Sequence, residues 1–345
     1  MLDVNPFDPG ATGRQPARDA PMHVSIVVPV YNEAGVIIEF NRRLAAVRNR
    51  LAVTSDVVFV DDGSRDQSPA LLRGLHESDR TISVITLSRN FGKEIAMTAG
   101  LDYSRGDAVI LIDADLQDPP ELIPTLIEQW SSAGADVVYA QRRSRAGETW
   151  LKKALAYGFY RVANLLARPP VPVDTGDFRL LSRRAVAALR QLREHHRFMK
   201  GLFSWIGYRQ IAVTYERDPR FSGKSKWNYW KLWNFSLDGV TSFSIAPLRM
   251  ASYIGFLTAG FALVYGFFIL VRTLLFGNPV AGYPSLLTLI LFLGGVQLIC
   301  LGIIGEYLGR VFNETKRRPL YLVDSVLSAT PDKLTAATLD VRTEA

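Results

Sequence analysis

Two long uncharged stretches near the C-terminus constrain this chain more than any other feature. Residues 250–271 and 285–305 are mostly apolar and carry no charge. Each is close to the roughly 20 residues that a helix needs to cross a bilayer. The alternative is a pair of helices buried in a soluble core. We predict two membrane-spanning helices at about 250–272 and 284–307, within a membrane segment at 249–309.

Positive charges flank these stretches unevenly. Arg249 precedes the first, and Arg310 and the run Lys316-Arg317-Arg318 follow the second, whereas Arg272 is the only charge near the connecting loop. Basic residues favour the cytoplasmic side, so both ends of the chain are expected in the cytoplasm, at the cytoplasmic (inner) membrane. A single cysteine, Cys300, excludes an internal disulfide and fits a reducing compartment.

Upstream of these stretches, short apolar runs alternate with amphipathic helical patterns. Residues 1–21 contain Pro, Gly and charges without the apolar core of a signal peptide, and we interpret them as a disordered lead-in. Repeated strand–helix units predict an α/β fold with a mostly parallel, doubly wound sheet, in a domain at 22–226. The expected strands cover residues 24–28, 57–60, 82–87, 108–112 and 136–140.

Carboxylates follow the fourth of these runs directly. Asp113 and Asp115 are separated by one residue, so both can offer hard oxygens to one divalent cation, with Gln117 adding a neutral oxygen. Ligands of open α/β sheets collect at the carboxyl ends of such strands. The alternative is structural, with Asp113 capping a turn and Asp115 starting a helix. The preceding apolar strand favours a site for a metal and a sugar nucleotide.

Two earlier turns also stand at strand ends. Tyr31 can stack on a base, and Asp61 or Asp62 can accept hydrogen bonds from a base or ribose. Taken alone, the second turn is equally typical of a tight turn with Gly63 at positive φ. Three carboxylate-bearing turns in one sheet favour a nucleotide site. No Gly-x-Gly-x-x-Gly follows the first strand, which argues against a dinucleotide cofactor.

These motifs resemble those of glycosyltransferase family 2, whose fold is GT-A, a Rossmann-like α/β domain. The stretch from Asp113 to Glu121 resembles the polyprenyl-phosphate branch of this family, which includes dolichol-phosphate mannose synthase and bactoprenol glucosyltransferase. The resemblance runs from about Val24 to Val323, and its N-terminal part rests on Val27-Val28-Pro29-Val30-Tyr31-Asn32-Glu33, Asp61-Asp62-Gly63-Ser64 and Asp113-Ala114-Asp115-Leu116-Gln117-Asp118-Pro119-Pro120-Glu121.

The resemblance implies roles for individual residues. The loop of basic residues after the fifth strand, from Gln141 to Arg145, is implied to bind the acceptor phosphate, and the alternative is an ordinary surface loop. Asp177 is implied to lie near the reaction centre, and the alternative is that it caps a turn. Donor-binding residues would be Pro29, Tyr31, Glu33, Asp61, Asp62, Asp113, Ala114, Arg220 and Lys226. Acceptor-binding residues would be Arg142, Arg143, Ser144 and Arg179; metal ligands Asp113, Asp115 and Gln117; and catalytic residues Asp115, Asp177, Arg142 and Arg143.

The implied activity is transfer of one sugar from a nucleoside diphosphate sugar to polyprenyl phosphate, with inversion and with Mg²⁺ or Mn²⁺. UDP-glucose and undecaprenyl phosphate are the substrates expected by resemblance. Alternatives are a GDP-mannose-dependent mannosyltransferase, a processive polysaccharide synthase, and a lipid-linked sugar flippase. A processive synthase would need a Gln-x-x-Arg-Trp motif, which the sequence lacks. Two spans with little polar lining disfavour a flippase.

The remaining segments suggest contacts with lipid. The formal charge of +7 fits an anionic membrane or a phosphate-rich substrate better than nucleic acid, because no basic tract with interleaved aromatics is present. Trp227, Trp230 and Trp233 share one helical face, so residues 227–248 are expected to form an interfacial amphipathic segment, with packing on the domain as the alternative. Residues 310–345 are expected to form a cytoplasmic tail. Small residues in the second span allow close packing in a homo-oligomer: Gly294, Gly295, Gly302 and Gly305.

Overall fold

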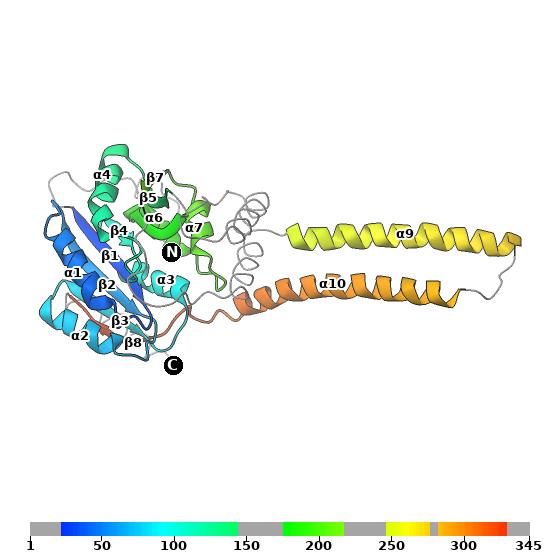
Figure 1. The fold of residues 1–345 in the computed structure, drawn as a ribbon, viewed down its shortest axis with the longest axis horizontal. Helices are drawn as coiled ribbons and strands as arrows, with labels where there is room; N and C mark the ends of the chain where they lie inside the picture. The colour runs from blue at the N-terminus through cyan, green and yellow to red at the C-terminus, as the bar shows by residue number, and fades with distance from the viewer. Residues whose placement is uncertain (1–21, 144–174, 217–245, 277–281, 330–345) are drawn as a thin grey trace, which may run out of the picture.

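The computed structural model describes residues 22–143, 175–216, 246–276 and 282–329. These residues form an α/β domain from which a helical hairpin extends (Figure 1). The elements of the domain are β1 (His23–Val30), α1 (Ile37–Arg48), β2 (Thr54–Asp61), α2 (Ser68–Ser78), β3 (Ile82–Leu87), α3 (Lys93–Tyr103), β4 (Ala108–Leu111), η1 (Pro120–Leu122), α4 (Ile123–Ala133), β5 (Val137–Arg142), β6 (Thr175–Ser182), α6 (Arg183–Gln191), α7 (Met199–Trp205), β7 (Gln210–Tyr215) and β8 (Val323–Leu327). The hairpin consists of α9 (Ala246–Phe276) and α10 (Tyr283–Thr315).

The sheet has the order β7-β5-β6-β4-β1-β2-β3-β8 within the described residues. The β4, β1, β2 and β3 strands are parallel, and β5 and β7 form a further parallel pair. Antiparallel pairing joins β6 to both β4 and β5, and β8 to β3. The predicted α/β fold with a mostly parallel sheet is therefore confirmed.

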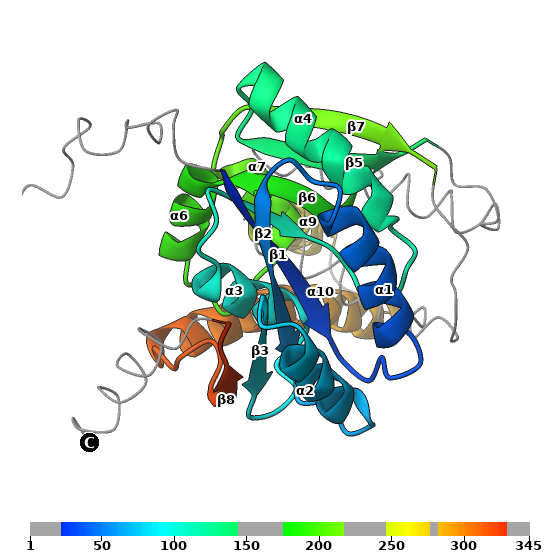
Figure 2. The ribbon, with the colours of Figure 1, turned by 90° about the vertical axis from the view of Figure 1, so that its left-hand side faces the viewer.

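Helices cover both faces of the sheet, which explains the unbroken apolar runs of the central strands. Along β1, Ile26 and Val28 pack into one core with residues of α1, α2 and α4, whereas Val27 packs into the opposite core with residues of α3, α6 and α7. Figure 2 shows α1, α2 and α4 on one side of the sheet and α3 and α6 on the other. The central strands are thus buried on both faces, and the side chains at their ends are positioned by this packed sheet.

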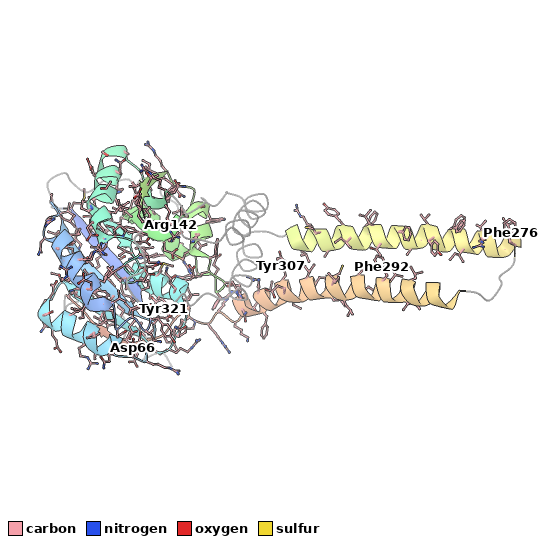
Figure 3. The ribbon with its side chains drawn as sticks, in the orientation of Figure 1. Asp66, Arg142, Phe276, Phe292, Tyr307 and Tyr321 are labelled. Carbon is pink, nitrogen blue, oxygen red and sulfur yellow. The ribbon has the colours of Figure 1, made fainter. Side chains whose placement is uncertain are left out.

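The hairpin helices are exposed and apolar. Segments long and apolar enough to cross a membrane lie at Leu248–Phe276 and Phe292–Thr315, and neither is buried against the protein. At about 1.5 Å per residue, α9 and α10 each exceed the roughly 30 Å of a bilayer core. Their apolar side chains project outward, with Phe276 at the tip far from the domain (Figure 3). The exposure argues against the alternative of two core helices and supports association with a membrane.

The segment after α10 returns to the domain. Our sequence-based division placed residues 310–345 in a tail and assigned no strand there, but β8 pairs with β3 at the edge of the sheet. Helix α6 ends at Gln191, and His195 and His196 lie beyond it. His195 Nδ1 lies 3.2 Å from Glu314 Oε2, and His196 Nε2 lies 3.0 Å from Asn313 Nδ2, so both histidines connect the domain to the end of α10. Residues 1–21 and most of the interfacial segment 227–248 lie outside the described residues.

Candidate active site

The predicted carboxylate turns meet at one edge of the sheet. Because β4, β1, β2 and β3 are neighbouring parallel strands, their carboxyl ends lie side by side. Along this edge come the Asp113 turn after β4, the Tyr31 turn after β1, Asp61 at the end of β2, and the loop from Ser88 after β3. A molecule with a diphosphate at one end and a nucleoside at the other can span this row.

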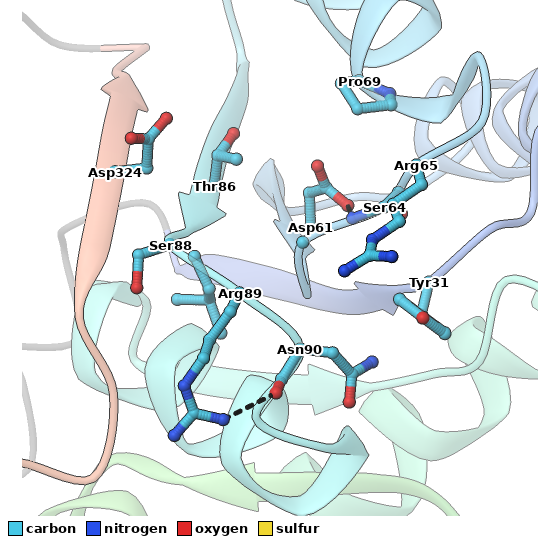
Figure 4. A pocket seen from close by; sticks show the side chains of 12 residues that line it. Tyr31, Asp61, Ser64, Arg65, Pro69, Thr86, Ser88, Arg89, Asn90 and Asp324 are labelled. Carbon is cyan, nitrogen blue, oxygen red and sulfur yellow. Dashed lines mark hydrogen bonds between the residues drawn. The ribbon is translucent and has the colours of Figure 1, made fainter.

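A pocket of about 330 Å³ lies over the ends of β1, β2 and β3 (Figure 4). Such a volume is at the small end of the range for ligand sites and suits one part of a nucleotide. The pocket is lined by Tyr31, Asp61, Gly63, Ser64, Arg65, Pro69, Thr86, Leu87, Ser88, Arg89, Asn90 and Asp324.

Asp61 is the most deeply buried charged group of this pocket. Its side chain is fully buried, and Oδ1 accepts a hydrogen bond from the Ser64 amide at 3.0 Å. Its Oδ2 atom is buried and has no hydrogen-bond partner among the described residues. Burial raises the pKa of Asp61, and hydrogen bonds from Ser64 partly oppose this. A buried acceptor of this kind is costly unless a ligand donates to it, so Asp61 fits an N–H or O–H group of a nucleoside.

Asp62 holds the neighbouring loop in place. Its two oxygens accept hydrogen bonds from the amides of Phe91, at 2.7 Å, and Gly92, at 2.9 Å. Gly63 follows at φ +67°, close against the backbone of Arg89. The carboxylate of Asp62 therefore positions the pocket wall, and its predicted contact with the donor stays a prediction.

The turn after β1 is joined to the turn after β2. Asn32, at φ 52°, donates its amide to Ser64 Oγ at 2.9 Å and accepts from the Arg65 amide at 2.8 Å. The Glu33 amide donates to Ser68 Oγ at 3.0 Å. Tyr31, which stands between Asn32 and β1, is 37% exposed at the pocket and can stack on a base. Pro29 lies within β1, and both it and Glu33 stay predicted donor contacts.

The Asp113 turn has a constrained backbone. Leu116 adopts φ 59° although it is a branched residue and almost fully buried, and such strain is common at functional sites. Asp115 Oδ1 accepts from the Gln117 amide at 3.1 Å. Asp118 accepts from the hydroxyl of Tyr215 on β7, while Ala114 packs in the core. The side chains of Asp113, Asp115 and Gln117 are partly exposed, so their oxygens are available as ligands for a metal ion.

Lys93, which the sequence did not single out, bridges two of the predicted site residues. Its Nζ donates to Asp113 Oδ2 at 2.7 Å and to Asp177 Oδ2 at 2.5 Å. Burial lowers the pKa of Lys93, but the charges of Asp113 and Asp177 outweigh it and raise that pKa overall. Burial raises the pKa of Asp113 to about 6, partly opposed by Lys93. Burial also acts on Asp177, but Lys93 and Lys200 reverse it and lower its pKa.

The register of the sheet explains how Asp177 reaches this cluster. Arg179 on β6 pairs with Leu111 on β4, so Asp177 lies two residues further along, beside Asp113. Asp177 therefore belongs to a strand rather than to a turn. Its Oδ1 is buried without a hydrogen-bond partner among the described residues. An orphaned acceptor here can take a proton-bearing group of a substrate, such as a sugar hydroxyl.

Arg179 is buried beneath this cluster. Its guanidinium donates to the Gly176 carbonyl at 2.8 Å and stacks 3.7 Å from the centre of the Phe203 ring. Burial lowers its pKa to about 10, and the charges of Asp177 and Glu94 oppose that change. From this position Arg179 supports β6 and α7, and its predicted role in acceptor binding stays a prediction.

The loop of basic residues that follows β5 lies within the described residues only as far as Arg143. Arg142 is hydrogen-bonded to Tyr215, which links it to the Asp118 turn. The side chain of Arg143 is mostly exposed, and its Nη1 atom lies 3.9 Å from Glu216 Oε1. Ser144, Arg220 and Lys226 lie outside the described residues. The structure therefore brings Arg142 to the same edge as Asp113, and the predicted donor binding by Arg220 and Lys226 stays a prediction.

Besides Lys93, sequence reasoning missed Glu94 and Asp324. Glu94 Oε2 accepts from the Met199 amide at 2.9 Å, and burial together with the charge of Asp177 raises its pKa to about 7. The sequence signal for Lys93 and Glu94 was their place at the first turn of a helix that follows a strand end. Asp324 gave no such signal, because it follows the membrane helices.

The residues of the metal turn fit a divalent cation. Two carboxylates one residue apart and an amide oxygen are the hard donors that Mg²⁺ and Mn²⁺ take. The described residues contain no group of three or more His, Cys, Asp or Glu side chains that could hold a metal ion. The cation would therefore complete its coordination with Gln117 and with oxygens of a bound diphosphate.

Known proteins match this chain over most of its length. The profile of Glycosyl transferase family 2 matches residues 25–190, and that of the GtrB C-terminal hairpin matches residues 246–311. An uncharacterised glycosyltransferase of Synechocystis is 52% identical over 88% of this chain and 96% of its own. A bactoprenol glucosyl transferase of Shigella phage SfX is 47% identical over 88% of this chain and 99% of its own.

Among solved structures, a mannosyl-3-phosphoglycerate synthase of Rubrobacter xylanophilus is similar over 64% of this chain and 72% of its own, with 19% identity and a TM-score of 0.46. The sequence relatives, with the strand-end carboxylates and the hairpin, identify the chain as a glycosyltransferase. It belongs to glycosyltransferase family 2.

Proposed function

We propose that this enzyme transfers a single glucose from UDP-glucose to undecaprenyl phosphate at the cytoplasmic face of the membrane, with inversion at the anomeric carbon. The observation that carries the proposal is the row of strand ends from β4 to β3. It sets a nucleoside-sized pocket with a buried unpartnered carboxylate oxygen beside a carboxylate turn suited to a diphosphate and its cation. The names of the 47% identical relatives support glucose and bactoprenol as substrates.

The hairpin supports a lipid acceptor. The helices α9 and α10 lie side by side, and a basic residue stands at one end of each: Arg249 in the first turn of α9 and Lys316 directly after α10. Basic residues favour the cytoplasmic side, so the domain would face the cytoplasm. An acceptor phosphate at the headgroup level would then lie on the same side of the membrane as the active site.

The chemistry demands little proton transfer. A phosphate monoester has its second pKa near about 6 and is largely dianionic at neutral pH, so the acceptor needs no strong general base. In the reaction an acceptor phosphate oxygen forms a bond to the anomeric carbon while the bond from that carbon to the UDP oxygen breaks. UDP leaves with the bonding electron pair, and a single displacement of this kind inverts the configuration.

Electrostatic stabilisation is the larger demand, because two anions meet at one carbon. A divalent cation held by Asp113, Asp115 and Gln117 would supply positive charge to the leaving diphosphate. Lys93 keeps Asp113 and Asp177 together although both are acidic. Arg142 and Arg143 are proposed to hold the acceptor phosphate, and Arg220 and Lys226 the diphosphate. Asp177, through its orphaned oxygen, is proposed to orient a sugar hydroxyl.

The test is a panel of radiolabelled sugar nucleotides offered to the purified protein in lipid nanodiscs with undecaprenyl phosphate and Mg²⁺ or Mn²⁺. Label from UDP-glucose is expected in the lipid phase, and much less from UDP-galactose, UDP-N-acetylglucosamine or GDP-mannose. Asp115→Asn, which keeps the side-chain shape, is the inactive control. Preferential transfer from GDP-mannose would replace the proposed donor, and full activity of Asp115→Asn would exclude Asp115 as a metal ligand.

A further inference from the structure

The donor pocket includes a strand that follows the membrane hairpin. After α10 the chain runs back to the domain, and β8 pairs antiparallel with β3 as the outermost strand of the sheet (Figure 2). Of the twelve residues that line the pocket, eleven precede residue 91, and the twelfth is Asp324 on β8. The pocket is therefore assembled from two parts of the chain separated by both hairpin helices.

A β-bulge sets the direction of Asp324. In the ladder Ser325 pairs with Thr86, and Val323 pairs with Leu87, so Asp324 is an extra residue without a partner on β3. Bulges of this kind re-aim a side chain and are frequent beside active sites. Figure 4 shows Asp324 on β8, next to Thr86 and across the pocket from Asp61.

The backbone is fixed on both sides of the bulge. Before it, the carbonyl of Leu322 accepts from the Ser88 amide at 2.9 Å, and the hydroxyl of Tyr321 donates to Asp102 Oδ2 at 2.8 Å. After it, the amide of Ala329 donates to Ser83 Oγ at 3.1 Å. The edge strand thus holds the Asp324 carboxylate at the pocket rather than leaving it to a mobile tail.

The order of the strands decides which part of the donor reaches Asp324. From the carboxylate turn after β4, the edge runs through β1, β2 and β3 to β8. A diphosphate beside Asp113 therefore directs the nucleoside toward Asp61 and Asp324. A carboxylate only accepts hydrogen bonds, and the nucleoside offers ribose hydroxyls and base N–H groups as donors. Acidic side chains bind ribose hydroxyls in the same way in dinucleotide folds.

We infer that Asp324 is a nucleoside-binding residue, whose carboxylate accepts a hydrogen bond from the ribose or base of the donor. The inference rests on the proposed function, since it takes the pocket to be the nucleotide site. It makes β8 a functional part of the enzyme, so that donor binding depends on chain that lies beyond the membrane helices.

The test is calorimetric titration of UDP into the full-length protein in nanodiscs. Asp324→Ala should weaken UDP binding by about three- to tenfold, the size expected for one exposed charge-assisted hydrogen bond. Asp324→Asn, which keeps an acceptor oxygen without the charge, should fall between Asp324→Ala and wild type. Ser325→Ala is the matched control, because Ser325 is also exposed on β8 but does not line the pocket. In turnover, the KM for UDP-glucose should rise by more than kcat falls.

Two further arms separate the possible results. If the loss caused by Asp324→Ala disappears with 2′,3′-dideoxy-UDP, the ribose is the partner; if it persists, the base is, and either result supports the inference. Asp61→Asn tests the pocket itself. If Asp61→Asn weakens UDP binding while Asp324→Ala binds as Ser325→Ala does, the inference about Asp324 is overturned alone. If wild type fails to bind UDP, the proposed function is overturned with it.

Discussion

Replacing Gly63 by Ala should damage both stability and donor binding. Gly63 has φ +67°, where an L-residue costs about 1–2 kcal/mol. An added Cβ would also lie 2.6 Å from the Arg89 carbonyl carbon and 2.8 Å from the Asn90 nitrogen. Both are backbone atoms, so the loop after β3 must move. We expect the free energy of unfolding to fall by about 2–5 kcal/mol in total, since overpacking typically adds about 1–3 kcal/mol.

Gly134 provides the matched control. It has φ +60° at the end of α4, but no atom lies within 4 Å of an added Cβ. Gly134→Ala should therefore show the conformational cost alone, about 1–2 kcal/mol, with unchanged UDP affinity. The assays are thermal unfolding of the purified protein and calorimetric titration of UDP. The reasoning fails if Gly63→Ala unfolds at the same temperature as Gly134→Ala and binds UDP as wild type does.

Three further predictions concern charged groups. Lys93→Met should lower kcat/KM at saturating cation by roughly tenfold to a hundredfold, because it removes charge-assisted hydrogen bonds to Asp113 at 2.7 Å and to Asp177 at 2.5 Å. Wild-type turnover would show that catalysis does not need the link that Lys93 makes between these two carboxylates. Changing Arg142 and Arg143 together to Gln should lower acceptor kcat/KM by about tenfold to a few thousandfold with little change in UDP affinity; a defect confined to UDP binding would count against the acceptor role. Asp136 has its pKa lowered because hydrogen bonds from Arg184 and Ser182 outweigh its burial. Its stabilising contribution is thus complete above its unfolded pKa of about 4 and is lost as the pH falls through the lower folded pKa. Asp136→Asn should unfold at a lower temperature than wild type at pH 7, and the difference between the two unfolding temperatures should become smaller below about pH 4. A difference in unfolding temperature that does not depend on pH would contradict this.

Much of the fold could be predicted because its signals are local. The apolar runs of β1 to β4 and the helical spacing between them occur within a few residues, and parallel pairing then brings their carboxyl ends together. The same reasoning predicted the hairpin, whose helices extend further than expected at 246–276 and 283–315. What the sequence concealed was pairing between distant segments. Insertion of β6 between β4 and β5, and return of β8 to β3, depend on tertiary contacts that no local pattern records.

The residues of the candidate site could likewise be predicted only where their sequence signal is local. Strand-end position was enough to single out Asp61 and Asp113. It could not reveal that Asp62 is bonded to the backbone of the next loop, because that partner lies about 30 residues away. Nor could it reveal Lys93, whose two partners lie 20 and 84 residues further along the chain. Side chains that act through such distant partners become visible only in three dimensions.

The most direct test of the account compares two acceptors that differ only in the phosphate. Purified protein in nanodiscs would receive labelled UDP-glucose with either undecaprenyl phosphate or undecaprenol, and the label extracted into the lipid phase would be counted. Because the acceptor phosphate is proposed to be a nucleophile that needs no strong base, label should enter only the phosphate lipid, as a product hydrolysed by mild acid with one glucose per lipid. Equal labelling of the alcohol, or growth of a glucose polymer, would contradict it.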